Sequence, residues 1–221
     1  MPSVEQLLVG YYTEEEDASS FETNSNASQA PPSAYQACGS VTMVRDDGVT
    51  ALVDCAGPAD KDRLLTALTL KNLTPADFTH VICTHGHVDH IGNLNLFPDA
   101  TTLLDLDISR RRRYWSLTFK KQDDNEVYRL SKNVEIYRLL GHTSHDLSVV
   151  VKECAGIEPL NGTVVVAGDI FEAEHDEAVW QTQSWNKELQ AASRKIILEL
   201  ADWIVPGHGM LFQNEKRKFS L

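Results

Sequence analysis

The stretch Thr84-His85-Gly86-His87-Val88-Asp89-His90 decides the fold, because it places three imidazoles and a carboxylate close together in the chain. It follows the apolar run Val81-Ile82-Cys83, which is typical of a buried strand. A chain that turns sharply after such a strand can direct these side chains to one point. Imidazole nitrogens and carboxylate oxygens hold a zinc-like ion at about 2.0–2.2 Å. The whole chain has only 8 histidines, so this cluster indicates a metal site rather than a chance group on the surface.

Three more candidate ligands lie downstream, each after an apolar run and beside a glycine that lets the backbone turn. They are His142 in Leu140-Gly141-His142, Asp169 in Ala167-Gly168-Asp169 and His208 in Pro206-Gly207-His208. Taken singly, a histidine after a strand is more often a hydrogen-bonded structural residue, and a Gly-Asp pair is usually a turn. Together with the first cluster they supply five histidines and two aspartates, which is enough for two metal ions.

These motifs resemble those of the metallo-β-lactamase superfamily. The resemblance implies that two Zn²⁺ ions are bound, with iron or manganese as alternatives. It implies that the first ion is held by His85, His87 and His142, the second by Asp89, His90 and His208, and that Asp169 bridges them. Asp54, in Leu52-Val53-Asp54-Cys55, is implied to orient the ligand stretch without binding a metal. Cys55 replaces the usual threonine, which leaves the hydrogen bonding of that loop open.

The resemblance also implies an α/β fold, the four-layer αββα sandwich, built as a single domain by residues 1–221. A chain of this length with 42% hydrophobic residues can bury one sizeable core. Apolar patterning predicts helices at 59–71 and 186–200. The polar, proline-containing segment 13–37 is expected to be a loop or a disordered excursion. Strands are expected at 6–11, 40–45, 50–54, 79–83, 134–139, 148–152 and 163–167.

The expected chemistry is metal-assisted hydrolysis. Two divalent ions about 3.5–4 Å apart lower the pKa of a bound water from about 15.7 towards 7, so that hydroxide is available at neutral pH. Asp89 and Asp169 are the predicted catalytic carboxylates, Asp89 orienting the attacking water and Asp169 holding the ions. His145 could protonate the leaving group, although a structural hydrogen bond is the commoner role of a loop histidine.

The resemblance is strongest to compact, stand-alone members of the superfamily. It implies a zinc-dependent endoribonuclease that acts on the 3′ end of histone pre-mRNA, as a homodimer in cytosol and nucleus. The alternative is a glyoxalase II-like thioester or ester hydrolase, because the ligand set is the same and the net charge is −12. Only 13 residues follow His208, so the helical C-terminal domain of glyoxalase II is not expected. A metal-binding scaffold without catalysis is disfavoured, since no ligand is missing.

A basic run with aromatic residues, Arg110-Arg111-Arg112-Arg113-Tyr114-Trp115, is the candidate contact to an RNA substrate. A solvated helix face or a dimer surface is the alternative interpretation of these four arginines. Trp180 and Trp185 follow Asp169 in the chain and could likewise be core or interface aromatics rather than base-stacking platforms.

The sequence also indicates in which cellular compartment the protein is expected. No run approaches the roughly 20 apolar residues that cross a bilayer, and the N-terminus lacks the pattern of a signal peptide. No membrane partner is therefore expected, and cytosol and nucleus are the default locations. The four cysteines, Cys38, Cys55, Cys83 and Cys154, are scattered without metal-binding spacing, so they are predicted to be reduced and largely buried.

Overall fold

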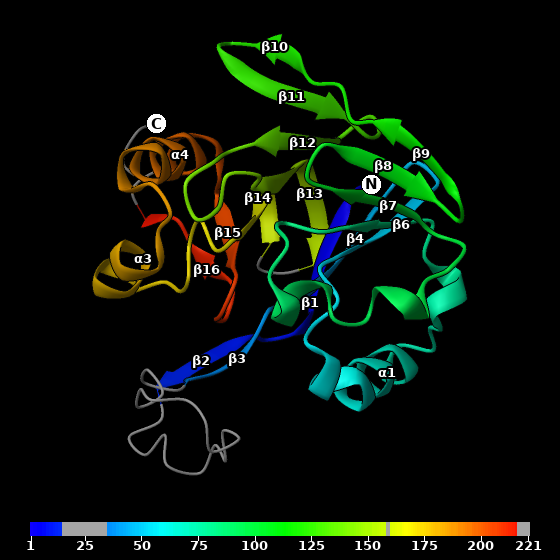
Figure 1. The fold of residues 1–221 in the computed structure, drawn as a ribbon. Coiled ribbons are helices and arrows are strands. Elements are labelled where there is room, and N and C mark those ends of the chain that lie inside the picture. The colour runs from blue at the N-terminus through cyan, green and yellow to red at the C-terminus, as the bar shows by residue number, and fades with distance from the viewer. Residues whose placement is uncertain (15–34, 158–159, 216–221) are drawn as a thin grey trace.

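The computed structural model describes residues 1–14, 35–157 and 160–215, which form two sheets packed face to face (Figure 1). The first sheet has the strand order β1-β4-β5-β6-β7-β8-β9, with β1 (Ser3–Leu8), β4 (Val41–Asp46), β5 (Val49–Val53), β6 (His80–Ile82), β7 (Thr101–Leu104), β8 (Asp107–Arg110) and β9 (Arg113–Ser116). The second has the order β10-β11-β12-β13-β14-β15-β16, with β10 (Lys120–Gln122), β11 (Asn125–Arg129), β12 (Val134–Arg138), β13 (Leu147–Ile157), β14 (Leu160–Gly168), β15 (Trp203–Pro206) and β16 (Phe212–Gln213).

Helices cover the outer faces of the sheets, which confirms the four-layer αββα sandwich. Leu64 and Leu68 of α1 (Lys61–Leu70) pack against the first sheet. Ile197 of α4 (Lys187–Leu200) packs against the second. The remaining helical segments are α2 (Val88–Ile91), α3 (Glu177–Gln183) and the 3₁₀ turns η2 (Pro58–Asp60), η3 (Pro75–Asp77) and η4 (Leu94–Leu96).

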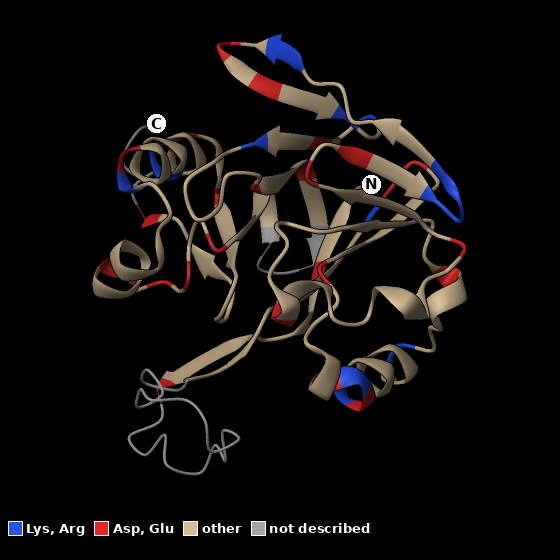
Figure 2. Ribbon diagram, viewed as in Figure 1, with Lys and Arg blue, Asp and Glu red and all other residues tan. Residues whose placement is uncertain are grey.

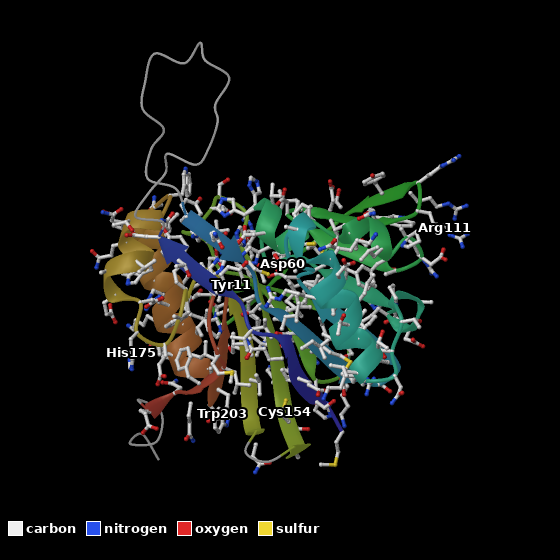
Figure 3. All side chains as sticks on the ribbon, turned by 90° about the horizontal axis from the view of Figure 1, so that it is seen from below. Tyr11, Asp60, Arg111, Cys154, His175 and Trp203 are labelled. Carbon is white, nitrogen blue, oxygen red and sulfur yellow. The ribbon has the colours of Figure 1, made fainter. Side chains whose placement is uncertain are left out.

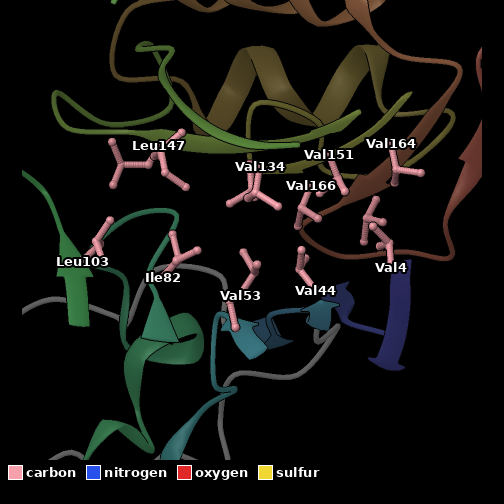
Figure 4. Packing of buried hydrophobic residues seen from close by; sticks show 14 of the residues in the cluster. Val4, Val44, Val53, Ile82, Leu103, Val134, Leu147, Val151, Val164 and Val166 are labelled. Atoms are coloured by element: carbon pink, nitrogen blue, oxygen red, sulfur yellow. The ribbon is translucent and has the colours of Figure 1, made fainter. Parts of the chain in front are cut away.

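The main core lies between the sheets. Figure 4 shows a row of side chains from the first sheet, including Val53 and Ile82, facing a row from the second that includes Val134 and Val166. Each of these is at most 4% exposed. Full burial of such a side chain stabilises the fold by about 1.5–3 kcal/mol. This packing holds the strand ends, from which the candidate ligands project, in fixed positions.

Most predicted strands and helices are confirmed, with shifted ends. The predicted helix 186–200 begins at Lys187, because the side chain of Asn186 caps it by accepting a hydrogen bond from the Leu189 N–H at 3.0 Å. The predicted helix 59–71 is divided into the 3₁₀ turn η2 and α1. The predicted strand 6–11 is misplaced, since β1 ends at Leu8. The chain then passes Gly10, where a Cβ would collide with the carbonyl oxygen of Gly207.

The expected loop 13–37 is corrected at both ends. β2 (Tyr11–Glu14) and β3 (Tyr35–Cys38) pair antiparallel as a separate two-stranded sheet, here called the β2–β3 hairpin. Tyrosine has a high propensity for β-strands, which is consistent with these two strands. In the sequence, the polar residues that follow Tyr12 nevertheless predict a loop. The interpretation of residues 15–34 as a polar loop lies outside the described residues. The hairpin extends from the edge of the sandwich in Figure 1.

The four cysteines are all buried and unpaired, as predicted. Across the described parts of the chain, no helix combines the length and the apolar character that crossing a bilayer requires.

Candidate metal centre

The candidate ligands follow the carboxyl ends of strands from both sheets. β6 leads into His85 and the rest of the ligand stretch, and β5, which runs parallel to β6, leads into Asp54. In the second sheet, β14 leads into Asp169 and the parallel β15 leads into His208. Parallel neighbours end at the same edge of a sheet, so each sheet brings its ligands to one place. His142 joins them from the loop after β12.

The first group consists of His85, His87, His142 and Asp169. His87 Nδ1 lies 2.9 Å from His85 Nε2 and 3.1 Å from His142 Nε2. Asp169 Oδ2 lies 3.5 Å from His85 Nε2 and 3.3 Å from His142 Nε2. Ligand atoms bound tetrahedrally to zinc at about 2.0–2.1 Å stand about 3.3 Å apart. The spacing of the group therefore fits four-coordinate zinc.

The second group consists of Asp89, His90 and His208. Asp89 Oδ2 is 3.6 Å from Nε2 of His90 and 3.6 Å from Nε2 of His208. Asp169 reaches this group too, with Oδ2 3.3 Å from His208 Nε2 and Oδ1 3.2 Å from His90 Nε2. The Asp169 carboxylate therefore lies beside both groups and is shared between them.

Unpartnered buried atoms test whether metal ions fit here. His90 Nε2 and Asp169 Oδ1 are enclosed by protein and lie 3.2 Å apart, but neither atom has a well-aligned hydrogen-bond partner. A buried polar atom left unsatisfied costs about 1–3 kcal/mol. Both atoms point into the groups described above, where a divalent cation would satisfy them. The residues thus fit two ions through their donor chemistry as well as through their spacing.

Asp54 supports the ligands from behind. Its carboxylate accepts hydrogen bonds from the Thr84 N–H and hydroxyl, both at 2.7 Å, and Oδ2 lies 2.8 Å from His90 Nδ1. A carboxylate at Nδ1 fixes the tautomer that leaves Nε2 free for a metal. The neighbouring Cys55 keeps the loop in place with its backbone, because its N–H donates to the His90 carbonyl at 2.7 Å. Asp54 therefore contacts the ligand stretch at both Thr84 and His90.

The charges in the site prepare it for cations. Burial lowers the pKa of His85 well below its usual value and lowers that of His142 to about 4, so both are neutral at neutral pH. Burial also disfavours the charged forms of His90 and His208, but nearby carboxylates together outweigh it and raise both pKa values, Asp169 with Asp54 at His90 and Asp169 with Asp89 at His208. Burial opposes ionisation of Asp169, yet the surrounding imidazoles hold its pKa well below the usual range. A metal ion at the His90 and His208 nitrogens would compete with their protonation.

Glu172 was not among the predicted site residues, but it lies in the same cavity. Its carboxylate is 3.5 Å from His142 Nδ1 and 3.8 Å from His208 Nε2, and it forms a third candidate metal-binding group with Asp169 and His208. Burial and the Asp169 carboxylate raise its pKa. The available signal was its position three residues after Asp169, in the turn that follows β14.

The ligands face an open cavity of about 280 Å³. Among its described lining residues there is no lysine or arginine. Besides the ligands and Glu172, its walls are formed by Tyr12, Tyr35, Ala37, Val88 and Gln183.

The four arginines are not brought to this cavity. Arg110 ends β8 and Arg113 begins β9, so the run forms a β-hairpin with Arg111 and Arg112 at its turn, rather than a helix face. Figure 2 shows this turn as a concentration of positive charge, and Figure 3 places Arg111 at one edge of the molecule, with Tyr11 of the β2–β3 hairpin nearer the middle. Arg111 forms an exposed ion pair with Asp99 at 2.6 Å.

The remaining candidates have local roles. His145 does not line the cavity, and its Nδ1 lies 2.8 Å from the Ser144 hydroxyl. Trp180 is buried, with the Arg194 guanidinium carbon 4.9 Å from its ring centroid, so it is a core aromatic. Trp185 is 61% exposed, and its backbone N–H donates to the carbonyl of His142 at 3.1 Å.

Comparison with known proteins agrees with this geometry. Residues 39–208 match the model of the metallo-beta-lactamase superfamily. The chain belongs to this superfamily. It is 45% identical to metallo-beta-lactamase domain-containing protein 1 of Xenopus laevis, over 81% of this chain and 74% of that protein. Identity to the human protein of the same name is 43%, over 73% of this chain and 59% of that protein, so the chain spans less than two thirds of the human relative.

Solved structures share the fold at low identity. An N-acyl homoserine lactone hydrolase with its product bound at the catalytic metal centre aligns with a TM-score of 0.59 and 16% identity, over 99% of this chain and 97% of that chain. A quorum-quenching N-acyl homoserine lactone lactonase aligns with a TM-score of 0.61 and 15% identity, over 100% of this chain and 94% of that chain. At these identities the likeness shows the fold alone.

Two metal ions per chain are expected, because the ligand atoms form two groups that share Asp169. Elemental analysis of zinc-supplemented protein should give two ions, and His87→Ala should lose at least one, since His87 lies within 3.1 Å of two other ligands of the first group. A well-folded wild-type protein holding one ion or none would contradict the dinuclear site.

Asp54→Asn should weaken metal binding by about 10–100-fold, the usual effect of removing a group that orients a metal ligand. Competition with a chelator measures this affinity. Asp46→Asn is the matched control, because Asp46 is also a buried carboxylate that accepts hydrogen bonds, from Ser131 and Asn133, but touches no candidate ligand. Equal loss of metal affinity in both variants would show that Asp54 acts through general stability.

Proposed function

We propose that the chain is a dinuclear zinc hydrolase that cleaves phosphodiester bonds in RNA as an endoribonuclease. The two ligand groups support hydrolysis, and the observation that carries the choice of RNA is the exposed hairpin of Arg110–Arg113. By family resemblance the substrate is the 3′ end of histone pre-mRNA, and the active form is a homodimer in cytosol and nucleus.

Each residue of the site would have a distinct role in hydrolysis. When bound, two zinc ions supply a water of lowered pKa and positive charge for the transition state. Asp169 holds the ligand groups together, and Asp54 fixes the tautomer of His90. Asp89 is partly exposed towards the cavity, so its carboxylate can accept a hydrogen bond from the attacking water and orient it. The neutral His85 and His142 need lose no proton before they bind a metal.

Charge complementarity supports RNA as the partner. The chain is acidic overall, yet its Arg110–Arg113 hairpin is basic, exposed and accompanied by Trp115, which is 50% exposed (Figure 2). Phosphates pair with arginine, and bases stack on aromatic rings. The ion pair of Arg111 with Asp99 is exposed, so it holds the arginine only weakly and can be replaced by a phosphate.

The lining of the metal cavity favours a second candidate function, the hydrolysis of a thioester or ester. Its described lining offers no cationic side chain for a phosphate, while Tyr12, Tyr35 and Val88 provide apolar surface. A thioester or ester with an apolar acyl group would suit these walls. The solved lactone hydrolases share the fold, which is compatible with this alternative.

Zinc-loaded protein is expected to cleave single-stranded RNA internally and to leave a glutathione thioester intact. Asp169→Ala should lower RNA cleavage by at least about a hundredfold, because it removes the charge that both ligand groups share. Gel analysis of the RNA and absorbance of the thioester measure the two reactions. Circular dichroism should be unchanged, since the carboxylate faces imidazoles rather than the apolar core. Thioester hydrolysis without RNA cleavage would select the second candidate.

Arg111→Ala combined with Arg112→Ala should weaken RNA binding and flatten its salt dependence by roughly 0.7 in log–log slope for each phosphate that the variant no longer binds. Fluorescence anisotropy across a salt series measures this. Hydrolysis of a small diester should be unaffected, because these arginines do not line the metal cavity. RNA affinity that stays unchanged at every salt concentration would assign the run to a solvated face or a dimer contact.

A further inference from the structure

Two tyrosines of the β2–β3 hairpin form a stacked pair beside the ligands. The ring centroids of Tyr12 and Tyr35 are 5.0 Å apart, with 30° between the planes. Tyr12 lies opposite Ala37 in the register and Tyr35 lies two residues before Ala37, so all three share one face of the hairpin. That face lines the metal cavity. The Tyr12 ring is also 6.3 Å from the ring of His208, so an aromatic surface extends outward from a ligand.

The hairpin holds this pair in place. Gln183 Nε2, at the end of α3, donates a hydrogen bond to the Tyr12 hydroxyl at 3.1 Å. On the other face of the hairpin, Tyr11 packs against the outer core of the first sheet. His208 Nδ1 lies 3.1 Å from the carbonyl oxygens of both Tyr11 and Cys38, so the two strands contact a ligand directly. The position of the pair is therefore tied to the position of the metal centre.

The pair leaves room for another planar group. Tyr35 stacks on Tyr12, yet it is still 56% exposed. The open cavity of about 280 Å³ is small beside a polynucleotide, and Tyr35 both lines it and is exposed to solvent. A substrate group next to the reacting one can therefore contact Tyr35.

Stacking is the contact that this rim offers. The described lining contains no cationic side chain to pair with a second phosphate, whereas a planar ring can lie on Tyr35. A base stacked on an aromatic side chain changes affinity by about 5- to 150-fold in alanine substitutions. Such stacking tolerates every base, because each has a π-face.

We propose that Tyr12 and Tyr35 form a platform for the nucleobase next to the scissile phosphate, with Tyr35 making the direct contact. This inference rests on the proposed action on RNA, and it assigns base recognition at the metal centre to residues outside the arginine hairpin. The platform selects a nucleotide over a sugar phosphate without reading sequence.

Adenosine 5′-monophosphate and ribose 5-phosphate test the platform, because they share the phosphate charge and differ by the base. Isothermal titration of zinc-loaded protein should give a Kd about tenfold lower for adenosine 5′-monophosphate. Tyr35→Ala should bring the two Kd values together. Tyr35→Phe is the matched control, since it keeps the ring and should keep the difference. Zinc content of each variant confirms that the metal centre is intact.

Equal or undetectable binding of the two ligands by the wild type would overturn the platform, as would a difference that Tyr35→Ala leaves unchanged. RNA cleavage is read separately in the same preparations. Base-dependent binding without RNA cleavage would retain the platform and reject the endoribonuclease. RNA cleavage without base-dependent binding would retain the endoribonuclease and reject the platform.

Discussion

The carboxylate of Asp169 lies among imidazoles supplied by both sheets, and the site is arranged around that contact. Asp169 is only 4% exposed, and an ionised carboxylate away from water is costly unless positive charge faces it. His90, whose pKa is raised, follows a strand of the first sheet, while His208, whose pKa is also raised, follows a strand of the second. The positive charge can therefore assemble only after the two sheets have packed together, so metal binding and closure of the sandwich stabilise each other.

Close packing around this carboxylate constrains the neighbouring chain. A Cβ at Gly207 would collide with Asp169 Oδ1, so the strand end that carries His208 can approach only as glycine. Gly168 has a φ of +57°, and a Cβ there would lie 2.6 Å from the Cβ of Thr84. Thr84 in turn donates its hydroxyl to Asp54, whose other contact is His90. Close packing and hydrogen bonds thus connect the ends of four strands, β5, β6, β14 and β15, so a small change at any of them would shift the ligands.

The ligands were predictable because their signal is local: histidines and aspartates at strand ends, beside glycines. The sandwich followed from the family resemblance and from helices with clear apolar faces. Other features depend on contacts between distant segments. Tyr12 and Tyr35 meet only because two strands pair across residues 15–34, and Glu172 gains its place from a turn that packs it against His142. The run Arg110–Arg113 has no periodicity of its own, so its hairpin conformation depends on pairing within the first sheet.

The Arg110–Arg113 hairpin does not line the metal cavity, and this separation has consequences for a nucleic acid substrate. Contacts between Arg110–Arg113 and a nucleic acid would be equally strong in the ground state and in the transition state. Such contacts would lower KM rather than raise kcat. Contacts at the metal cavity act on the reacting phosphate and can orient it. Only an RNA long enough to reach both regions gains both effects. The cavity is open, so a strand can continue beyond the cleaved bond. For a nucleic acid substrate, these features would allow cleavage within a long chain as well as at its end.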